Sequence, residues 1–286
     1  MLSLTCFFSS AFITNDVALI TFVPFSIALL KKQGAKTLIF AVTLETVAAN
    51  LGSLLTPIGN PQNLFLYSFY SMSIGDFFKI TLPLGTICLT LVCILCVFRK
   101  NRPLANDTNE KSYTLKKMPL LAYAVLFVMA ILSVLGIIRW YVSLATVLVF
   151  TLIYKKELIL KADYILLFTF ICFFIFVGNV ARIDTVSHFV TNAIHNREMV
   201  FSALISQFIS NVPAAAMLSS FTDNAKALII GTNIGGLGTI IASMASLISY
   251  RYISKTEDVK ASRYLICFSA VNFSLLLLLI SVYTFI

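Results

Sequence analysis

The sequence predicts an all-α polytopic membrane protein with two inverted repeats, each holding one re-entrant hairpin and one discontinuous helix. The first observation is composition. Of the 286 residues, 59% are hydrophobic and 12% are charged, whereas a soluble domain has about 45–50% apolar and about 25% charged residues. The second is a pair of polar, helix-breaking motifs that occurs twice within apolar segments. The third is the position of the basic residues, which fall mainly in loops between those segments.

The duplicated motifs are the most informative part of the sequence. Residues 50–56 (NLGSLLT) match residues 233–239 (NIGGLGT) at an Asn, a Gly, a Leu and a Thr. Residues 12–15 (FITN), upstream of the first copy, resemble residues 208–211 (FISN), upstream of the second. Polar and helix-breaking residues at matching positions of two apolar halves are typical of secondary transporters built from two repeats.

The first repeat begins with a predicted re-entrant hairpin over 1–30. Its two apolar arms, 1–13 and 17–30, are separated by residues 14–16 (TND). At about 1.5 Å per residue each arm covers about 20 Å, which is less than the ~30 Å hydrocarbon core of a bilayer. A pair of tilted spans, or one span with a polar kink, would also fit this pattern.

The remaining elements follow from the alternation of apolar runs and polar breaks. The first repeat, 1–98, continues with a broken span over 37–72, interrupted by residues 56–61 (TPIGNP), a short loop around Ser73–Phe78 and a span over 80–98. Residues 99–117 are the most polar stretch and form the predicted cytoplasmic linker. The second repeat, 118–286, is predicted to contain scaffold spans within 118–180 (118–137, 140–154 and 163–180), a polar loop over 182–198, a re-entrant hairpin over 199–222 with residues 210–213 (SNVP) at its tip, a broken span over 226–250 and a last span over 264–285.

The basic residues indicate a topology. If the first hairpin opens to the cytoplasm, most of the 21 Lys and Arg residues lie in cytoplasmic loops, as the positive-inside rule requires. The first hairpin then enters the membrane from inside and the second from outside, so the repeats are inverted. We therefore expect a multi-pass protein of the cell membrane with basic loops in the cytoplasm and its C-terminus outside.

The breaks in the predicted helices indicate a binding site. Irregular backbone at membrane depth is costly unless it lines a polar cavity or is buried in protein, so we expect the four breaks to meet. Each break starts a short helix whose N-terminus favours an anion. Asn60 before Pro61 is a typical N-cap and first-turn pair, and Asn211 with Pro213 is similar. Freed carbonyls, with Thr and Asn oxygens, suit Na⁺.

Two carboxylates, Asp16 and Glu45, are the only ones that this topology places inside the membrane. An Asp at mid-membrane costs about 2.5–3.5 kcal/mol on insertion scales, so a tolerated one is a functional candidate. Asp16 could carry a proton or bind a cation, and a plain helix N-cap explains it equally well. For Glu45 a structural or pairing role is favoured, with proton carriage second.

Other classes of function are disfavoured. The net charge of +9 fits the positive-inside rule, and no Lys/Arg run is interleaved with aromatic residues, so we expect no nucleic-acid partner. The motifs HExxH and GxSxG and paired catalytic acids are absent, so we expect no enzyme, no catalytic residue and no cofactor beyond a coupling Na⁺ or H⁺. The expected partners are a small anionic or oxyanion substrate and the lipid bilayer.

Four stretches of the chain resemble a known superfamily. Residues 13–19 (ITNDVAL), 56–63 (TPIGNPQN), 209–213 (ISNVP) and 231–239 (GTNIGGLGT) are similar to motifs of the ion-transporter superfamily of arsenite permeases, sodium–proton antiporters, citrate carriers and divalent anion:sodium symporters. The resemblance extends over the whole chain. It implies a mobile transport domain made of the hairpins and broken spans, elevator-type motion and a dimeric scaffold, hence a homodimer.

Two departures from the superfamily pattern narrow the resemblance. The symporter branch has Ser-Asn-Thr at both tips, whereas this chain has Thr14-Asn15-Asp16 and Ser210-Asn211-Val212, which is closer to the arsenite-permease and antiporter side. The family pattern also places three scaffold spans before the first hairpin, and this sequence starts at the hairpin. We therefore expect an N-terminally truncated chain whose first repeat is incomplete.

The combined prediction is a secondary active transporter, or permease, of a small anion or oxyanion, coupled to H⁺ or Na⁺ and working by an elevator. The alternatives are an inactive or structural remnant of such a transporter and a sodium–proton antiporter. The predicted substrate- and ion-binding residues come from both repeats: Thr14, Asn15, Asp16, Thr56, Asn60, Ser210, Asn211, Asn233, Gly235 and Thr239. Of these, Asn15, Thr56, Asn211 and Thr239 are the candidate Na⁺ ligands.

Overall fold

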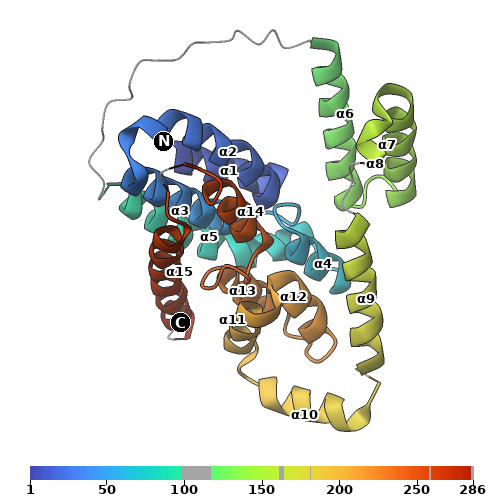
Figure 1. Cartoon of the computed structure of the whole chain (residues 1–286). Helices are drawn as coiled ribbons and strands as arrows, with labels where there is room; N and C mark the ends of the chain where they lie inside the picture. The colour runs from blue at the N-terminus through green and yellow to red at the C-terminus, as the bar shows by residue number, and fades with distance from the viewer. Residues whose placement is uncertain (98–116, 161–163, 181, 258, 285–286) are drawn as a thin grey trace. The chain divides into compact units, whose positions relative to one another are not determined.

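The computed structural model describes residues 1–97, 117–160, 164–180, 182–257 and 259–284 (Figure 1). Every regular element within these residues is a helix, which confirms the all-α prediction. The predicted linker over 99–117 lies outside the described residues except for Lys117. The chain divides into two compact units, one formed by 1–104 with 172–286 and the other by 105–171.

The smaller unit is a helical hairpin. It contains α6 (Lys117–Val134), α7 (Trp140–Lys155) and the single turn α8 (Glu157–Leu160). Helix α6 ends where Gly136 adopts a positive φ of 74° and the Ile137 N–H bonds the Leu132 carbonyl at 3.0 Å, a usual glycine stop. The ring of Tyr123 on α6 meets Phe150 on α7 edge to face, with centroids 5.8 Å apart. Helix α9 (Tyr164–Val180) follows in the chain.

The larger unit contains two helical hairpins that turn on a single residue. In the first, α1 (Leu2–Ile13) and α2 (Asn15–Leu30) are separated by Thr14 alone. In the second, α11 (Glu198–Ile209) and α12 (Asn211–Ser219) are separated by Ser210 alone. The arms of twelve residues, α1 and α11, are too short to cross a hydrocarbon core of about 30 Å, because a helix rises about 1.5 Å per residue.

Each hairpin is followed by a helix that breaks and resumes. In the first repeat, the helices are α3 (Ala35–Gly52), continued by the 3₁₀ turn η2 (Ser53–Leu55), and α4 (Pro61–Phe69), with η1 (Lys31–Gln33) leading into α3. In the second repeat they are α13 (Ala225–Gly235) and α14 (Met244–Ile253). One long helix closes each copy, α5 (Ile74–Val97) and α15 (Ala261–Thr284).

The two repeats use the same close packing between hairpin and broken helix. Helix α1 packs on α3, and α11 packs on α13. A Cβ added to Gly52 of α3 would lie 2.0 Å from the Phe7 carbonyl oxygen, and one added to Gly235 of α13 would lie 2.8 Å from the Ser206 Cβ. The matched glycines of the duplicated motif are therefore required where the first arm of each hairpin crosses its broken helix.

Side chains from both repeats share one apolar core. Phe7, Leu51 and Leu84 of the first repeat cluster with Ile234 and Leu276 of the second, all almost fully buried. Three helical segments of the described residues are long and apolar enough to cross a membrane, namely Ala35–Leu55, α5 and α15. Most of the first is buried inside the protein, whereas α5 and α15 leave most of their length outward-facing, as expected for one interior helix and two outer ones.

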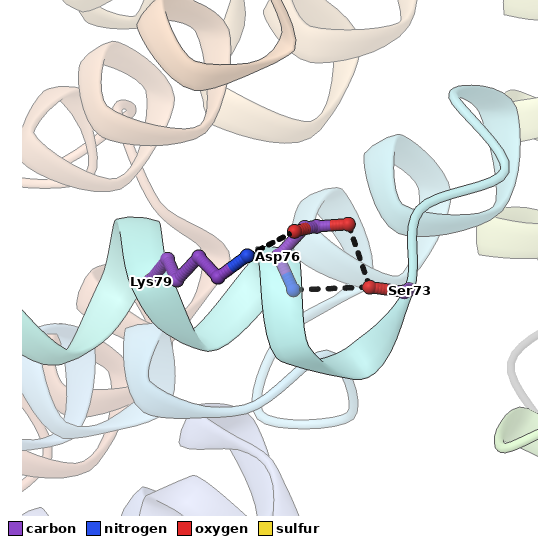
Figure 2. Close-up of polar contacts among 3 residues, drawn as sticks. All are labelled: Ser73, Asp76 and Lys79. Carbon is purple, nitrogen blue, oxygen red and sulfur yellow. Dashed lines mark hydrogen bonds and ion pairs between the residues drawn. The ribbon is translucent and has the colours of Figure 1, made fainter.

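Two predicted loops are wrong. Residues Ser73–Phe78 are not a loop, because α5 already begins at Ile74. Figure 2 shows the cause: the Asp76 N–H donates to the Ser73 hydroxyl at 3.1 Å, that hydroxyl bonds the Asp76 carboxylate at 2.6 Å, and Lys79 pairs with the same carboxylate at 2.8 Å. This Ser-x-x-Asp arrangement caps the first turn of a helix.

The polar loop predicted over 182–198 instead contains a helix, α10 (Asp184–Ile194). Val190 and Ile194, four residues apart, pack against Phe221 in an apolar cluster with α12 and α13. The four-residue spacing of Val190 and Ile194 predicts a helix with one apolar face on a core, but the polar composition of 182–198 hides it.

Candidate functional site

Both hairpin tips have the same unusual backbone conformation. Thr14 has φ 70° and ψ 151°, and Ser210 has φ 74° and ψ 152°. Side-chain-bearing residues rarely adopt a positive φ with an extended ψ, and such strain costs about 1–3 kcal/mol per residue. Strain of this kind persists only where the surrounding structure holds it, and it is concentrated at functional sites. The near-identity of the two tips shows that the sequence duplication extends to backbone geometry.

Each tip is bonded to the break of its own repeat by the same two hydrogen bonds. The Asn15 N–H donates to the Gly59 carbonyl at 3.1 Å, and the Asn211 N–H donates to the Ala242 carbonyl at 2.9 Å. The Thr56 hydroxyl donates to the Ala11 carbonyl, and its counterpart Thr239 donates to the Gln207 carbonyl at 2.9 Å. The matched Thr residues of the duplicated motif thus hold the hairpin tips against the broken helices.

A network of buried side-chain amides crosses between the repeats. On one side, the side-chain oxygen Oδ1 of Asn50 accepts from the side-chain nitrogen Nδ2 of Asn15 at 3.1 Å and from the Ser243 hydroxyl at 2.9 Å. On the other side, Oδ1 of Asn233 accepts from Nδ2 of Asn60 at 3.0 Å, and Nδ2 of Asn233 donates to Oδ1 of Asn63 at 2.6 Å.

The pattern is an exchange between the repeats. Asn50, in the first segment of the first repeat's broken helix, accepts from Ser243, the N-cap of α14 in the second repeat. Asn233, in the first segment of the second repeat's broken helix, accepts from Asn60, the N-cap of α4 in the first repeat. The five Asn residues of the network are at most 4% exposed. Each bond therefore forms away from water, where a donor or acceptor left without its partner costs about 1–3 kcal/mol.

The start of α2 is already supplied with acceptors. The Asn15 N–H bonds Gly59, the Asp16 N–H bonds the Asn15 side-chain oxygen at 2.9 Å, and the Val17 N–H bonds the Thr14 hydroxyl at 3.4 Å. The positive end of this helix can favour an anion by its dipole. In this conformation it offers no free donor from these three amides.

Asp16 is a carboxylate next to the network, since its N–H donates to the Asn15 side chain. It lies in the first turn of α2, where a negative charge is favourable. Its Oδ1 atom is buried and has no hydrogen-bond partner among the described residues. The corresponding residue of the second tip is Val212, so the two halves of the site differ in charge.

Gly235 is explained by packing. Its Cα lies against Ser206 and Ala203 at the crossing of α11 and α13, and no room remains for a side chain. Among the predicted residues, the structure brings Asn15, Asn60 and Asn233 into the amide network through Asn50, Asn63 and Ser243. It places Thr56, Ser210, Asn211 and Thr239 at the contacts between tips and breaks, and Thr14 at the turn of the first hairpin.

Four residues of this network were not in the predicted set: Asn50, Asn63, Gln207 and Ser243. Asn50 occupies the same position in the first copy of the duplicated motif as Asn233 does in the second, and that match could have identified it. Gln207 has no such signal. Its amide donates to the Gly235 and Leu237 carbonyls at 2.9 and 3.0 Å, and its oxygen accepts from the Thr239 N–H at 2.8 Å, so it holds the unwound segment in place.

The network contains amides, hydroxyls and backbone groups, and none of its members is Lys, Arg or His. Among the described residues, no group of three or more His, Cys, Asp or Glu is arranged to hold a metal ion. Oxygen-rich, uncharged sites of this kind suit weakly bound monovalent cations and polar or anionic small molecules better than a structural transition metal.

Comparison with known proteins decides the family. The family model described as "Citrate transporter" (CitMHS) matches residues 1–227. The chain belongs to the citrate transporter family. It is therefore a membrane transporter and not an enzyme, as the duplicated motifs predict.

Of three proteins similar to this chain, two are named as transporters and one as an inner membrane protein. The chain is 33% identical over 268 residues to an uncharacterized transporter of Methanocaldococcus jannaschii, which covers 93% of this chain and 73% of the relative. It is 30% identical over 247 residues to the inner membrane protein YbiR of Escherichia coli, covering 85% of this chain and 66% of the relative. A shorter match, 33% identical over 94 residues, covers 32% of this chain and 19% of the silicon efflux transporter LSI3 of Oryza sativa.

Proposed function

We propose that this citrate-transporter-family protein is a secondary active transporter of a small anion or oxyanion, with H⁺ or Na⁺ as the coupling ion. The observation that carries the proposal is the matched pair of strained tips, each bonded to the break of its own repeat. The Asn60–Asn233 and Ser243–Asn50 bonds join the two halves into one buried polar centre. A centre shared by two inverted repeats can be exposed to either side of a membrane by moving one set of helices against another.

The chemistry of the centre supports a small substrate rich in acceptor oxygens. Asparagine amides at Asn15, Asn60 and Asn211 are donors that can bind such oxygens, and the helices beginning at Asn211, Pro61 and Met244 direct positive dipole ends to the breaks. Because no basic side chain lies in the network, a bound anion would be compensated by dipoles and by a bound cation.

A coupling Na⁺ is best supported at the tip–break contacts. Asn15 with Thr56 in the first repeat, and Asn211 with Thr239 in the second, supply amide and hydroxyl oxygens beside the irregular backbone. Hard cations prefer such oxygen ligands. Two equivalent contacts would provide up to two cation sites, one per repeat.

The names of related proteins support the same substrate class. The family description names citrate and one relative's name refers to silicon. A polyoxygen substrate is common to both, and a centre of amide and hydroxyl groups is suited to it.

An elevator mechanism, a homodimer and the predicted sidedness belong to this proposal. The chain separates into a unit that holds both hairpins and a unit that holds α6–α8, which agrees with a moving part and a stationary part. We propose that the first hairpin enters from the cytoplasm and that the basic loops are cytoplasmic.

Sodium–proton antiport is the second candidate. Asp16 favours it, because a carboxylate oxygen without a partner at the edge of the network is a suitable Na⁺ ligand. Sodium flux without any anion flux, lost in Asp16→Asn, would favour antiport over anion transport.

The proposal is tested by flux into proteoliposomes under an imposed Na⁺ or pH gradient, with arsenite, citrate, dicarboxylates and sulfate as probes. We expect gradient-driven flux of at least one probe, lost in Asn15→Ala and retained in Asn179→Ala. Asn179 is a matched control because its amide bonds only the Ile175 carbonyl of its own helix at 2.8 Å. Wild-type liposomes that move none of the probes, or unchanged flux in Asn15→Ala, would refute the proposal.

A further inference from the structure

Glu45 is a fully buried carboxylate that lies outside the amide network. It lies on α3, is 0% exposed, and its Oε1 atom accepts a short hydrogen bond from the Ser26 hydroxyl of α2. Its Oε2 atom is buried with no hydrogen-bond partner among the described residues. No Lys, Arg or His of the described residues forms an ion pair with it. A buried carboxylate normally has a basic partner or a set of donors when it is ionised.

The groups around Glu45 are hydroxyls, thiols and apolar side chains. Cys6 of α1 donates to the Glu45 backbone carbonyl at 3.6 Å, and Tyr264 of α15 belongs to the same buried cluster as Cys6, its hydroxyl having no hydrogen-bond partner among the described residues. Helix α14 contributes the Ser249 hydroxyl, which bonds Thr46 at 2.7 Å.

The remaining elements that pack on α3 include α5, α13 and η1, and η1 carries the exposed residues Lys31 and Lys32. Helices α5 and α13 meet α3 on the side of Val47 and Leu51 in an apolar cluster that includes Cys88. In η1, Lys31 is half exposed and paired with Glu257 at 3.1 Å. The carboxyl group is therefore buried and can accept one proton, and neither Lys31–Glu257 nor Lys79–Asp76, the ion pairs among the described residues, includes it.

The Glu45 pocket has no equivalent in the second repeat. Glu45 lies five residues before Asn50, and Leu228 lies five residues before the matching Asn233. The sequence duplication accounts for the hairpin tips, the helix breaks and the matched Asn residues, but Glu45 occurs in the first repeat alone.

We propose that Glu45 is the coupling-proton site of this transporter, separate from the anion centre. The proton adds to a carboxylate oxygen of Glu45 and leaves from the same group, so no electron moves and no other reactant is consumed. The proposal rests on the proposed function for its role in transport, whereas proton binding itself is tested without a substrate.

The position of Glu45 explains how proton binding would affect the anion centre. Helix α2 begins at Asn15 and carries Ser26, and helix α3 carries both Glu45 and Asn50. The Ser26–Glu45 bond and the Asn15–Asn50 bond thus join the same two helices. A carboxylate is a stronger acceptor than a neutral acid, so the charge of Glu45 changes how firmly the first hairpin is held to α3. By linkage, substrate binding must then change proton affinity to the same extent.

A second row of polar contacts joins the two sites. The Asn50 amide reaches the Ser246 hydroxyl at 3.4 Å, and one turn away Thr46 bonds Ser249 at 2.7 Å, both between α3 and α14. Glu45 is adjacent to Thr46 on α3. A rearrangement of these contacts between α3 and α14 would change the surroundings of both the amide network and Glu45.

The substrate-free test is infrared spectroscopy of the purified full chain during a pH titration. We expect wild type to show the carbonyl band of a protonated carboxylic acid that disappears as the pH rises, and Glu45→Gln to lack that band. Glu257→Gln is the matched control, because Glu257 is 84% exposed and should leave the band unchanged. A band that persists in Glu45→Gln, or a Glu45 signal that is ionised throughout and shifts when Na⁺ is added, would overturn the assignment.

Ser26→Ala tests the same pocket without removing the acid. Loss of its hydroxyl should move the midpoint of the band to higher pH while the band remains, because the ionised form loses its donor. An unmoved midpoint would contradict the geometry on which the proposal depends. This variant also covers the case in which Glu45→Gln fails to fold.

The transport test uses whichever probe anion the wild type moves. Its affinity should change by up to about tenfold for each pH unit across the titrating range, as one linked proton requires, and Glu45→Gln should still exchange the anion with no such dependence. A pH dependence that survives in Glu45→Gln would refute the coupling role. Absence of all anion flux in wild type would refute the proposed function, and the infrared result would still decide proton binding.

Discussion

Replacing Asn233 by Ala should both loosen the protein and abolish transport. Asn233 is 2% exposed, and its side chain accepts from Asn60 and donates to Asn63 and to the Ile229 carbonyl. After truncation, the Asn60 amide still has the Ser53 hydroxyl at 3.1 Å. The Asn63 side-chain oxygen loses its donor in a fully buried position.

The expected size of the effect follows from these contacts. An orphaned buried acceptor costs about 1–3 kcal/mol, and the lost Asn60 bond adds about 0.6 kcal/mol, the average for polar contacts between membrane helices. Together they predict a loss of about 2–4 kcal/mol in the free energy of unfolding, as a lower transition midpoint in detergent. A double-mutant cycle with Asn60→Ala should give a coupling of about 0.5–1.5 kcal/mol, because the two side chains are in contact.

Asn179→Ala is the control for this experiment, since its amide bonds only within its own helix and it is exposed. It should change the unfolding free energy by less than about 0.5 kcal/mol. If Asn233→Ala unfolds and transports like wild type, or if the cycle gives no coupling, the cross-repeat network is not what joins the two halves.

Three further sets of substitutions test the fold around the site. Gly52→Ala places a Cβ 2.0 Å from the Phe7 carbonyl oxygen and should destabilise the protein by about 1–3 kcal/mol in thermal unfolding. Gly75→Ala is the control, because the nearest atom to its Cβ would be 3.8 Å away, and it should be neutral or slightly stabilising. Equal unfolding midpoints for the two variants would contradict the close crossing of α1 and α3. Ser210→Gly should raise stability by about 1 kcal/mol and Ser210→Val should lower it, because φ is 74° there; the reverse order would argue against the strained tip. Ser73→Ala should cost about 1 kcal/mol through the α5 cap and leave flux unchanged, and loss of flux would show that this cap is coupled to the site.

Most of the fold could be predicted from periodicity and composition. The hairpin tips were located to within two residues, because an apolar run interrupted by Thr14 or Ser210 and an Asn leaves few alternatives. The break at residues 56–60 was also located, since Asn60 and Pro61 are strong helix-start signals. Helix α10 was missed, because an amphipathic helix at the edge of an apolar core is mostly polar.

The composition of the site was less predictable than its location. Repeat matching found Asn233 and Thr239, yet it does not say that Asn50 and Asn233 exchange partners between repeats, which depends on tertiary packing. Gln207 has no counterpart in the first repeat, where Ala11 lies at the matching position, so symmetry could not reveal it. Gly235 looked like part of an unwound binding segment, and only the approach of Ser206 explains it by packing. The binding roles of all ten predicted residues stay predictions.

The central claim is that one substrate centre is built jointly by the two repeats. Equilibrium binding of a transported probe to purified wild type, Asn15→Ala and Asn211→Ala tests it most directly, with unfolding midpoints measured in parallel. We expect each single variant to weaken binding by at least tenfold, about 1.4 kcal/mol, while remaining folded. Full affinity in either variant would mean that one repeat alone holds the substrate, and would contradict the account.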